Sequence, residues 1–303
     1  MATYQRKQYV RRTWRLLSCS FLIFILSGCN QHSESPSGAF YQPLNQDKTL
    51  KQQDWVSIAK TMERYELSQV VVQWTQYGDE TFGGPSGWLA QNLETLVDND
   101  IQLWLGLYSD PNYFKRIHAN VEQQQQYLTR YFEELEKSYQ RWKPWIEQHQ
   151  PKINGLYLPL ELSDYDFVTQ QQRDLITNVL AQQVEKYPMP LMVTLYLAAN
   201  NDPDVIRKWT KEIRQAGITL YVQDGAGTQS LSGEQRRNYL NSLSCETGLV
   251  REVFVQEHQS SQFVAKKMNK QAFLKLVTQR SCHSSILFSL RYFPDNNPLK
   301  LVK

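Results

Sequence analysis

One stretch of this 303-residue chain reads Ile-Asn-Gly-Leu-Tyr-Leu-Pro-Leu-Glu, from Ile153 to Glu161. Leucine occupies every second position from Leu156 to Leu160, whereas Gly155, Tyr157 and Pro159 occupy the alternate positions. Successive side chains of a strand point to opposite faces, so this alternation predicts a strand with one apolar face. Glu161 then ends the strand on the face opposite the leucines.

Seven further apolar runs, separated by longer amphipathic stretches, extend this pattern along the chain. We expect strands at 38–44, 69–77, 101–109, 153–161, 191–198, 218–224, 250–257 and 285–292. We expect helices between them at 51–66, 86–99, 120–148, 169–187, 203–215, 233–243 and 263–279. This alternation is typical of βα units in a parallel sheet. Eight strands predict an α/β fold of the (β/α)₈ TIM-barrel type.

A doubly wound open sheet is the alternative fold. That fold carries a Gly-rich phosphate turn after its first strand. Here the corresponding residues are Tyr41-Gln42-Pro43-Leu44, which contain no glycine. The sequence therefore favours the barrel, as one domain over 38–303.

The first 28 residues predict a signal peptide of the lipoprotein type. Basic residues precede a short apolar run at 21–26, and Leu26-Ser27-Gly28-Cys29 then resembles the lipobox of bacterial lipoproteins. In such proteins the chain is cut before the cysteine and its thiol is acylated, as with palmitate. The apolar run is too short to span a bilayer. A transmembrane anchor or an ordinary secreted protein is the alternative.

Residues 29–37 predict a lipidated tether, because the stretch from Ser33 to Ser37 is polar and rich in Ser and Pro. Asn30, rather than Asp, follows Cys29. By resemblance to enterobacterial sorting rules, this favours a place in the bacterial envelope at the outer membrane, facing the periplasm. The expected membrane contact is the lipid at Cys29.

The charge of the chain belongs mostly to its leader. The formal net charge is +3, but five of the 33 Lys and Arg residues precede Cys29, whereas none of the 30 Asp and Glu residues does. The remainder is mildly acidic. We therefore expect no nucleic-acid partner.

Cys245 and Cys282 are the two cysteines left after Cys19 and Cys29 are assigned to the leader and the lipid. They lie just before the seventh and eighth expected strands, at the same end of neighbouring strands. In an oxidising compartment such a pair predicts a disulfide. A free buried pair is the alternative.

Barrel enzymes carry their chemistry at the C-terminal ends of the strands. The expected strand ends hold carboxylates, amides and aromatic rings that suit a sugar, because hydroxyls need polar partners and the C–H face of a ring stacks on aromatics. The candidate substrate-binding residues are Tyr41, Gln42, Gln73, Trp74, Tyr77, Tyr108, Tyr196, Gln223 and Gln256.

The sequence lacks the motifs of metal-dependent, serine-hydrolase, nucleotide-binding and cysteine-dependent enzymes. The five histidines are scattered, and no Gly-x-Ser-x-Gly elbow, Walker loop or cysteine nucleophile is apparent. We therefore expect neither a metal nor another cofactor.

Several short motifs resemble an uncharacterised family of glycoside-hydrolase-like barrels, known as a domain of unknown function. They are Tyr41-Gln42-Pro43, Val72-Gln73-Trp74-Thr75, Tyr77-Gly78-Asp79, Trp104-Leu105-Gly106-Leu107-Tyr108, Pro159-Leu160-Glu161 and Gln223-Asp224-Gly225. The resemblance spans nearly the whole chain after the leader. It implies the barrel fold, here in a bacterial lipoprotein.

A looser analogy concerns retaining glycosidases, whose acid/base ends strand four and whose nucleophile ends strand seven. The corresponding residues here are Glu161 and Glu257, although Leu160 rather than Asn precedes Glu161. Strand parity directs Gln256 inward and leaves Glu257 at the rim. Asp224, at the end of the sixth expected strand, is the other candidate for the second carboxylate.

Two functions follow from these residues. The first is a glycosidase acting on a polysaccharide, with Glu161 as general acid/base. The second is a non-catalytic glycan-binding or polysaccharide-assembly lipoprotein that keeps the barrel and the aromatic pocket but lacks the second carboxylate. For Glu161 itself, the alternative is a carboxylate satisfied by structural hydrogen bonds.

Overall fold

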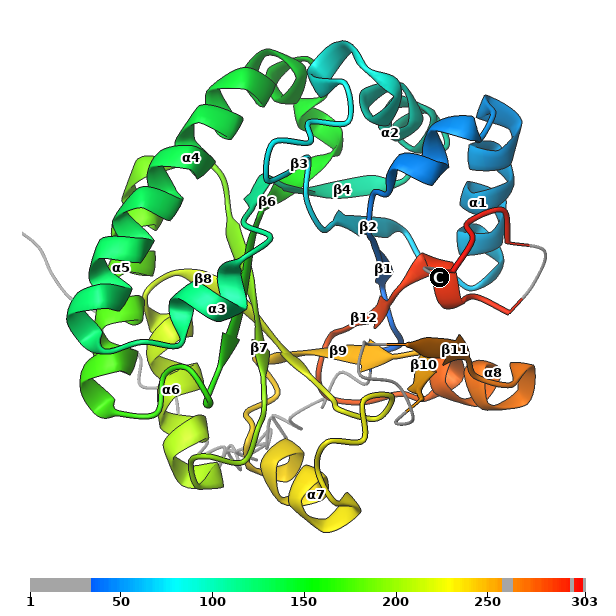
Figure 1. The fold of residues 1–303 in the computed structure, drawn as a ribbon. Coiled ribbons are helices and arrows are strands. Elements are labelled where there is room, and N and C mark those ends of the chain that lie inside the picture. The colour runs from blue at the N-terminus through cyan, green and yellow to red at the C-terminus, as the bar shows by residue number, and fades with distance from the viewer. Residues whose placement is uncertain (1–33, 258–263, 295–296, 302–303) are drawn as a thin grey trace, which may run out of the picture. The chain divides into compact units, whose positions relative to one another are not determined.

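A computed structural model describes residues 34–257, 264–294 and 297–301. Eight parallel strands close into a barrel, which Figure 1 shows as a ring enclosed by helices. The last strand pairs with the first, so the predicted (β/α)₈ TIM barrel is confirmed. The barrel strands are β1 (Gly38–Tyr41), β2 (Gln69–Val72), β4 (Gln102–Gly106), β6 (Ile153–Ser163), β7 (Leu191–Tyr196), β8 (Ile218–Gln223), β9 (Gly248–Glu252) and β12 (Ser285–Phe288).

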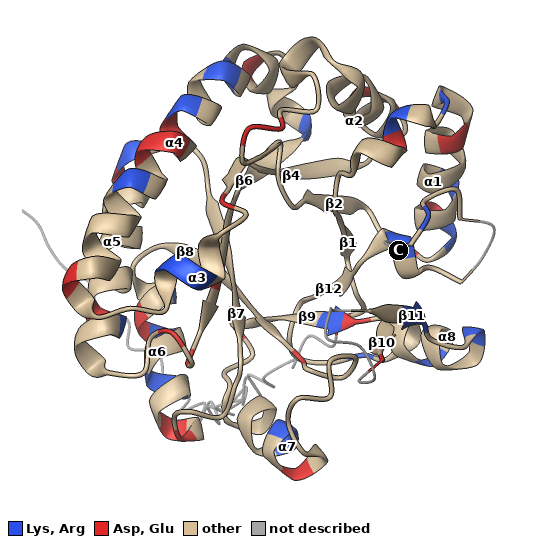
Figure 2. Ribbon diagram, viewed as in Figure 1, with Lys and Arg blue, Asp and Glu red and all other residues tan. Residues whose placement is uncertain are grey.

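Six of the seven predicted helices follow their predicted ranges closely. The helix predicted over 263–279 begins only at Lys270, because Ala265–Lys267 forms a short strand instead. The helices are α1 (Gln52–Arg64), α2 (Trp88–Asp98), α4 (Val121–Gln148), α5 (Gln170–Lys186), α6 (Pro203–Gln215), α7 (Gly233–Ser242) and α8 (Lys270–Thr278), with a short additional helix α3 (Tyr113–Ile117). Asn120 and Asn269 cap α4 and α8, since each side chain accepts a hydrogen bond from a backbone N–H of the first turn. Charged residues lie mostly on the outer helices in Figure 2.

A layer of eight side chains fills the barrel interior, one from each strand. These are Phe40, Val71, Trp104, Tyr157, Met192, Tyr221, Val250 and Ile286. Alternate positions on the strands face the helices and form a separate, larger core with them. Tyr157 thus lies inward, on the face opposite the leucines of β6, and the layer closes the barrel below the strand ends.

Most of the predicted strands end earlier than expected, and after three of them the chain forms a further short strand. Beyond β2 and β4 the chain forms β3 (Gln76–Tyr77) and β5 (Tyr108–Ser109), which pair in parallel at the rim. Beyond β9 it forms β10 (Phe254–Gln256), which pairs antiparallel with β11 (Ala265–Lys267). The seventh barrel strand is therefore present, but its predicted end at residue 257 is wrong, because β9 ends at Glu252 and the chain then enters this hairpin.

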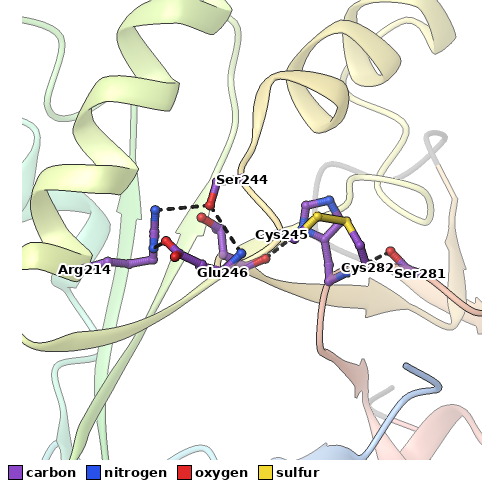
Figure 3. The surroundings of a disulfide bond; sticks show 8 residues. Arg214, Ser244, Cys245, Glu246, Ser281 and Cys282 are labelled. Atoms are coloured by element: carbon purple, nitrogen blue, oxygen red, sulfur yellow. Dashed lines mark hydrogen bonds and ion pairs between the residues drawn. A yellow bond between two sulfur atoms is a disulfide. The ribbon is translucent and has the colours of Figure 1, made fainter. Parts of the chain in front are cut away.

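Cys245 and Cys282 form a disulfide bond with an S–S distance of 2.07 Å. Their Cα atoms are 5.2 Å apart, and the two residues precede β9 and β12. Figure 3 shows the bond beside the ion pair of Arg214 and Glu246. The predicted disulfide is confirmed.

The domain begins before Gly38. Glu34 pairs with Ser281 through two backbone hydrogen bonds, and the backbone N–H of Ser37 donates to the carbonyl of Ser285 at 2.9 Å. The last residues of the predicted tether are thus part of the folded unit. The predicted signal peptide and Cys29 lie outside the described residues. Within the described ranges, no helix is long and apolar enough to cross a membrane.

Candidate active site

A cavity of about 790 Å³ opens at the C-terminal ends of the barrel strands. Phe40, Tyr157 and Val250 of the interior layer line it, so the layer forms its floor. The cavity wall includes eight of the residues predicted from the sequence. They are Gln42, Gln73, Trp74, Tyr77, Glu161, Tyr196, Gln223 and Gln256.

Tyr41 and Tyr108 lie elsewhere, and the prediction that they line the pocket is wrong. Tyr41 faces the helix layer, packs against Trp55 at a ring distance of 5.0 Å and donates a hydrogen bond to Asp47. Phe40 points inward, so Tyr41 must point outward. Tyr108 lies on β5, where its ring packs 5.7 Å from that of Tyr131.

Glu257 lies beyond β10, at the outside of the rim. Its carboxylate is about half exposed and lies 3.4 Å from the ammonium of Lys266. The placement of Glu257 at the end of a barrel strand is therefore wrong, because the β10–β11 hairpin carries the chain away from the barrel.

Asp224 is buried behind the pocket wall rather than in it. Arg236 lies 3.2 Å from its carboxylate, which also accepts hydrogen bonds from the backbone N–H groups of Ala226 and Glu252 at 3.1 and 3.2 Å. The predicted position of Asp224 in the pocket is wrong. Its contacts instead hold the loop after β8 against the end of β9.

Glu161 lies near the end of β6, where the pairing of β6 with β7 shifts register after Tyr157. Such an irregularity re-aims the side chains that follow it. Gln223 donates from Nε2 to Oε1 of Glu161 at 2.5 Å. Burial raises the pKa of Glu161, the hydrogen bond from Gln223 lowers it, and the negative charge of Asp166 raises it. The environment therefore favours a protonated Glu161 more than water does.

Glu252 is the carboxylate that ends β9, and the sequence prediction missed it. It is 2% exposed and lines the cavity. Its Oε2 accepts hydrogen bonds from the backbone N–H groups of Gly227 and Thr228, both at 2.7 Å. Burial and the neighbouring Asp224 raise the pKa of Glu252 to about 7, against those hydrogen bonds. The alternation of side chains along a strand could have indicated Glu252. Because Val253 faces the helices, its neighbour Glu252 must face the barrel interior.

The phenol of Tyr196 is affected by the charges of both Glu161 and Glu252. Burial raises the pKa of its phenol, and the negative charges of Glu252 and Glu161 both raise it further. Its hydroxyl donates to Ser230 on the loop after β8 at 2.6 Å. The phenol of Tyr196 thus lies within the electrostatic reach of both acids.

Residues 37–286 match the model of the domain of unknown function DUF4434. The chain belongs to the DUF4434 family. It is also 26% identical over 288 residues to the uncharacterized protein YbcH of Escherichia coli K12, covering 90% of this chain and 96% of YbcH. The family and the sequence-based resemblance to barrels of unknown function agree.

A solved structure shows the same fold as this DUF4434 domain. It is that of a candidate alpha-L-fucosidase from Bacteroides thetaiotaomicron, with a TM-score of 0.61 and 13% sequence identity. The match covers 89% of this chain and 92% of the other. At this identity the likeness concerns the fold alone, which is a TIM barrel.

Two further acids of the DUF4434 pocket have fixed partners. Asp110 lies 2.9 Å from both the guanidinium of Arg116 and the hydroxyl of Tyr127. Asp166 accepts a hydrogen bond from Ser163 at 2.6 Å and lies 3.2 Å from His118. Asp166 was not among the predicted site residues. Neither acid belongs to a group of three His, Cys, Asp or Glu side chains placed to hold a metal, and the described residues contain no such group.

Proposed function

We propose that this protein is a glycosidase that acts on a polysaccharide, with Glu161 as general acid/base and Glu252 as the second carboxylate. The observation that carries the proposal is that these two acids end the fourth and seventh barrel strands and line one cavity. Most glycosidases hydrolyse the glycosidic bond with two catalytic carboxyl groups that flank it.

Glu161 is suited to donate the first proton. A general acid needs a pKa raised toward the working pH, and burial supplies that shift here. When Glu161 protonates the glycosidic oxygen, the bond to the anomeric carbon breaks and the leaving sugar departs as an alcohol.

Glu252 is suited to stabilise or attack the anomeric carbon. Its Oε2 is held by two backbone N–H groups, which fix the carboxylate and oppose the effect of burial on its pKa, so that Glu252 is mostly charged above about pH 7. A retaining enzyme would form a glycosyl ester on Glu252, which water then hydrolyses with Glu161 as base. An inverting enzyme would use Glu252 to activate water directly. The anomer of the first product distinguishes the two routes.

The amide and aromatic groups of the wall are suited to a sugar. Gln42, Gln73 and Gln256 offer donors and acceptors for hydroxyls, and Trp74 offers an aromatic face. The Oε1 atom of Gln73 is buried without a hydrogen-bond partner among the described residues. A sugar hydroxyl in the pocket would supply that partner.

The proposed setting is the bacterial envelope, with the protein anchored through lipid on Cys29. The support is the order of a basic segment, an apolar run and Leu26-Ser27-Gly28-Cys29 in the sequence. Labelled palmitate should be incorporated into the wild-type protein in bacteria and not into Cys29→Ser. Equal labelling of both would refute the anchor.

The activity is tested by incubating soluble protein from Gln31 onward with bacterial envelope and extracellular polysaccharides and measuring new reducing ends. We expect turnover of at least one glycan by the wild type and its loss in Glu161→Gln.

The alternative is a glycan-binding protein without catalysis. The observation in its favour is that Glu161 and Glu252 both accept hydrogen bonds within the protein, so each also has a structural role. Binding of a glycan without new reducing ends, at any enzyme concentration, would establish this alternative.

A further inference from the structure

One edge of the cavity carries a fixed pair of aromatic rings. Trp74 and Tyr77 lie with ring centroids 4.9 Å apart, and Trp74 donates from Nε1 to the carbonyl of Pro43 at 3.1 Å. Both line the cavity, and Tyr77 is 39% exposed. We call this pair the first platform. Its hydrogen bond fixes the indole plane before any ligand arrives.

Two more aromatic rings line the cavity at another part of the rim. Phe114 on α3 and Tyr165 after β6 are 61% and 51% exposed, although both line the cavity. Tyr165 stacks on His118 with ring centroids 4.3 Å apart and planes 10° apart. Asp166 lies 3.2 Å from His118 and holds it in place. We call Phe114 and Tyr165 the second platform.

The two platforms belong to separate parts of the rim, and the second lies close to Glu161. In Figure 1, α3 lies at the left of the ring, whereas β3, which carries Tyr77, lies at the top. Tyr113 on α3 donates from its hydroxyl to the backbone carbonyl of Glu161 at 3.2 Å. No ring contact among the described residues joins the two platforms, and a chain of sugars would offer one ring to each.

The charges of the cavity wall all have one sign. Among the described lining residues there are four carboxylates, on Asp110, Glu161, Asp166 and Glu252, and no Lys, Arg or His. Arg116 and His118 partly offset Asp110 and Asp166 from outside the lining.

Glu161 and Glu252 have only neutral hydrogen-bond donors among the described residues. The donors are Gln223 for the first, and backbone N–H groups with the Thr228 hydroxyl for the second. A carboxylate, sulfate or phosphate on the ligand would find no cation in this lining to pair with, and each of these acids that is ionised would repel it.

We propose that the pocket binds a chain of several sugars that carry no anionic groups, with sugar rings stacked on the Trp74–Tyr77 platform and on the Phe114–Tyr165 platform. The inference rests on the proposed function in using the same pocket, and it names the substrate class: neutral or amine-bearing chains rather than polyuronates or sulfated glycans.

The test is calorimetric titration of the wild-type protein with defined probes. The probes are cellohexaose, a glucosamine hexamer with the same β-1,4 linkage, a galacturonate hexamer and cellobiose, each checked by mass spectrometry for cleavage afterwards. We expect at least one non-anionic hexamer to bind about tenfold or more tightly than both the galacturonate hexamer and cellobiose. Equal or tighter binding of the galacturonate hexamer, or no binding of either non-anionic hexamer, would overturn the proposal.

Variants separate the two platforms from general surface effects. Tyr165→Ala should weaken hexamer binding about five- to tenfold and leave any cellobiose affinity nearly unchanged. Leu274→Ala, which removes an exposed apolar side chain on α8, is the matched control and should change neither. An unchanged hexamer affinity in both Tyr165→Ala and Tyr77→Ala would contradict the platform assignment.

The preference for ligands without anionic groups is tested by placing a positive charge at Gln256, which lies on β10 and lines the cavity. Relative to Gln256→Met, which has similar length and no charge, Gln256→Lys should strengthen binding of the galacturonate hexamer and weaken that of the glucosamine hexamer. The opposite order would contradict the charge argument.

Failure of this inference and failure of hydrolysis are distinguishable. If the affinities follow the predicted order but no new reducing ends form, the proposed catalysis is refuted and the substrate class stands. If the galacturonate hexamer is cleaved preferentially, the substrate class is refuted and the proposed catalysis stands.

Discussion

Gln223 donates a hydrogen bond from Nε2 to Oε1 of Glu161 at 2.5 Å, which joins the end of β8 to β6 across the cavity wall. A donated hydrogen bond favours the charged carboxylate, so Gln223 lowers the pKa of Glu161 against the opposing effect of burial. Gln223 therefore tunes the proton affinity of the proposed general acid.

Replacing Gln223 by Leu should raise the pKa of Glu161 further. If Glu161 must be protonated to act, the high-pH limb of the pH profile of kcat/KM should move to higher pH in Gln223→Leu. The profile is measured on the glycan identified by the reducing-end screen. An unmoved limb would show that another group sets it.

The raised pKa of Glu252 predicts that the free energy of unfolding depends on pH. Its pKa is raised from an ordinary value of 4.5 to about 7 by burial and by Asp224. Because the folded state binds this proton more tightly, its contribution to stability is present below pH 4.5 and is lost as the pH rises through 7.

Glu252→Gln removes this titration while keeping an oxygen for the N–H groups of Gly227 and Thr228. Relative to wild type, the variant should gain up to about 3 kcal/mol in free energy of unfolding between pH 4.5 and pH 8. Urea denaturation at the two pH values measures the difference. A constant offset between the two proteins would contradict the raised pKa.

The disulfide predicts a redox-dependent stability. The bond between Cys245 and Cys282 closes a loop with a sequence separation of 37. Loops of this size correspond to about 2–4 kcal/mol of stabilisation. The double variant Cys245→Ser/Cys282→Ser should lose this amount in denaturant unfolding, and reductant should then have no further effect. A loss below about 1 kcal/mol would refute a stabilising role for the bond.

Replacing the buried Arg291 by an uncharged residue should strongly destabilise the folded protein. Arg291 is fully buried, forms an ion pair with Asp47, and donates to the carbonyls of Gln42 and Lys300 at 2.6 and 2.8 Å. Arg291→Met leaves the buried carboxylate of Asp47 without its cation, which should cost about 3–5 kcal/mol in free energy of unfolding.

The control for Arg291 is the double variant Arg291→Met/Asp47→Asn. It removes both charges and should recover part of the lost stability, as measured by the same urea titration. If the double variant were as unstable as the sum of the single variants, the ion pair would carry no coupling energy.

Much of the fold could be predicted because its signals are local. The leucine alternation before Glu161 and the pattern of apolar runs suffice to predict the barrel, and the barrel topology then places Cys245 near Cys282. Glu161 and Gln223 were found by the same reasoning, since each lies at the end of a strand whose parity is clear.

Glu252 was missed because the apolar residues after it continue the appearance of a strand. The chain leaves the barrel at this point, since Phe254 pairs with Lys267 in an antiparallel hairpin. That pairing joins residues far apart in the sequence, and no local pattern indicates it. Tyr108 was misplaced for the same reason, because β4 ends at Gly106 and the rim strand β5 begins after it.

The proposed pairing of Glu161 with Glu252 is tested most directly by measuring turnover in three variants. On a glycan that the wild type cleaves, Glu161→Gln and Glu252→Gln should each reduce the release of reducing ends by at least about a hundredfold, while Glu257→Gln should retain nearly full activity. Retained activity in Glu252→Gln with loss in Glu257→Gln would contradict the account.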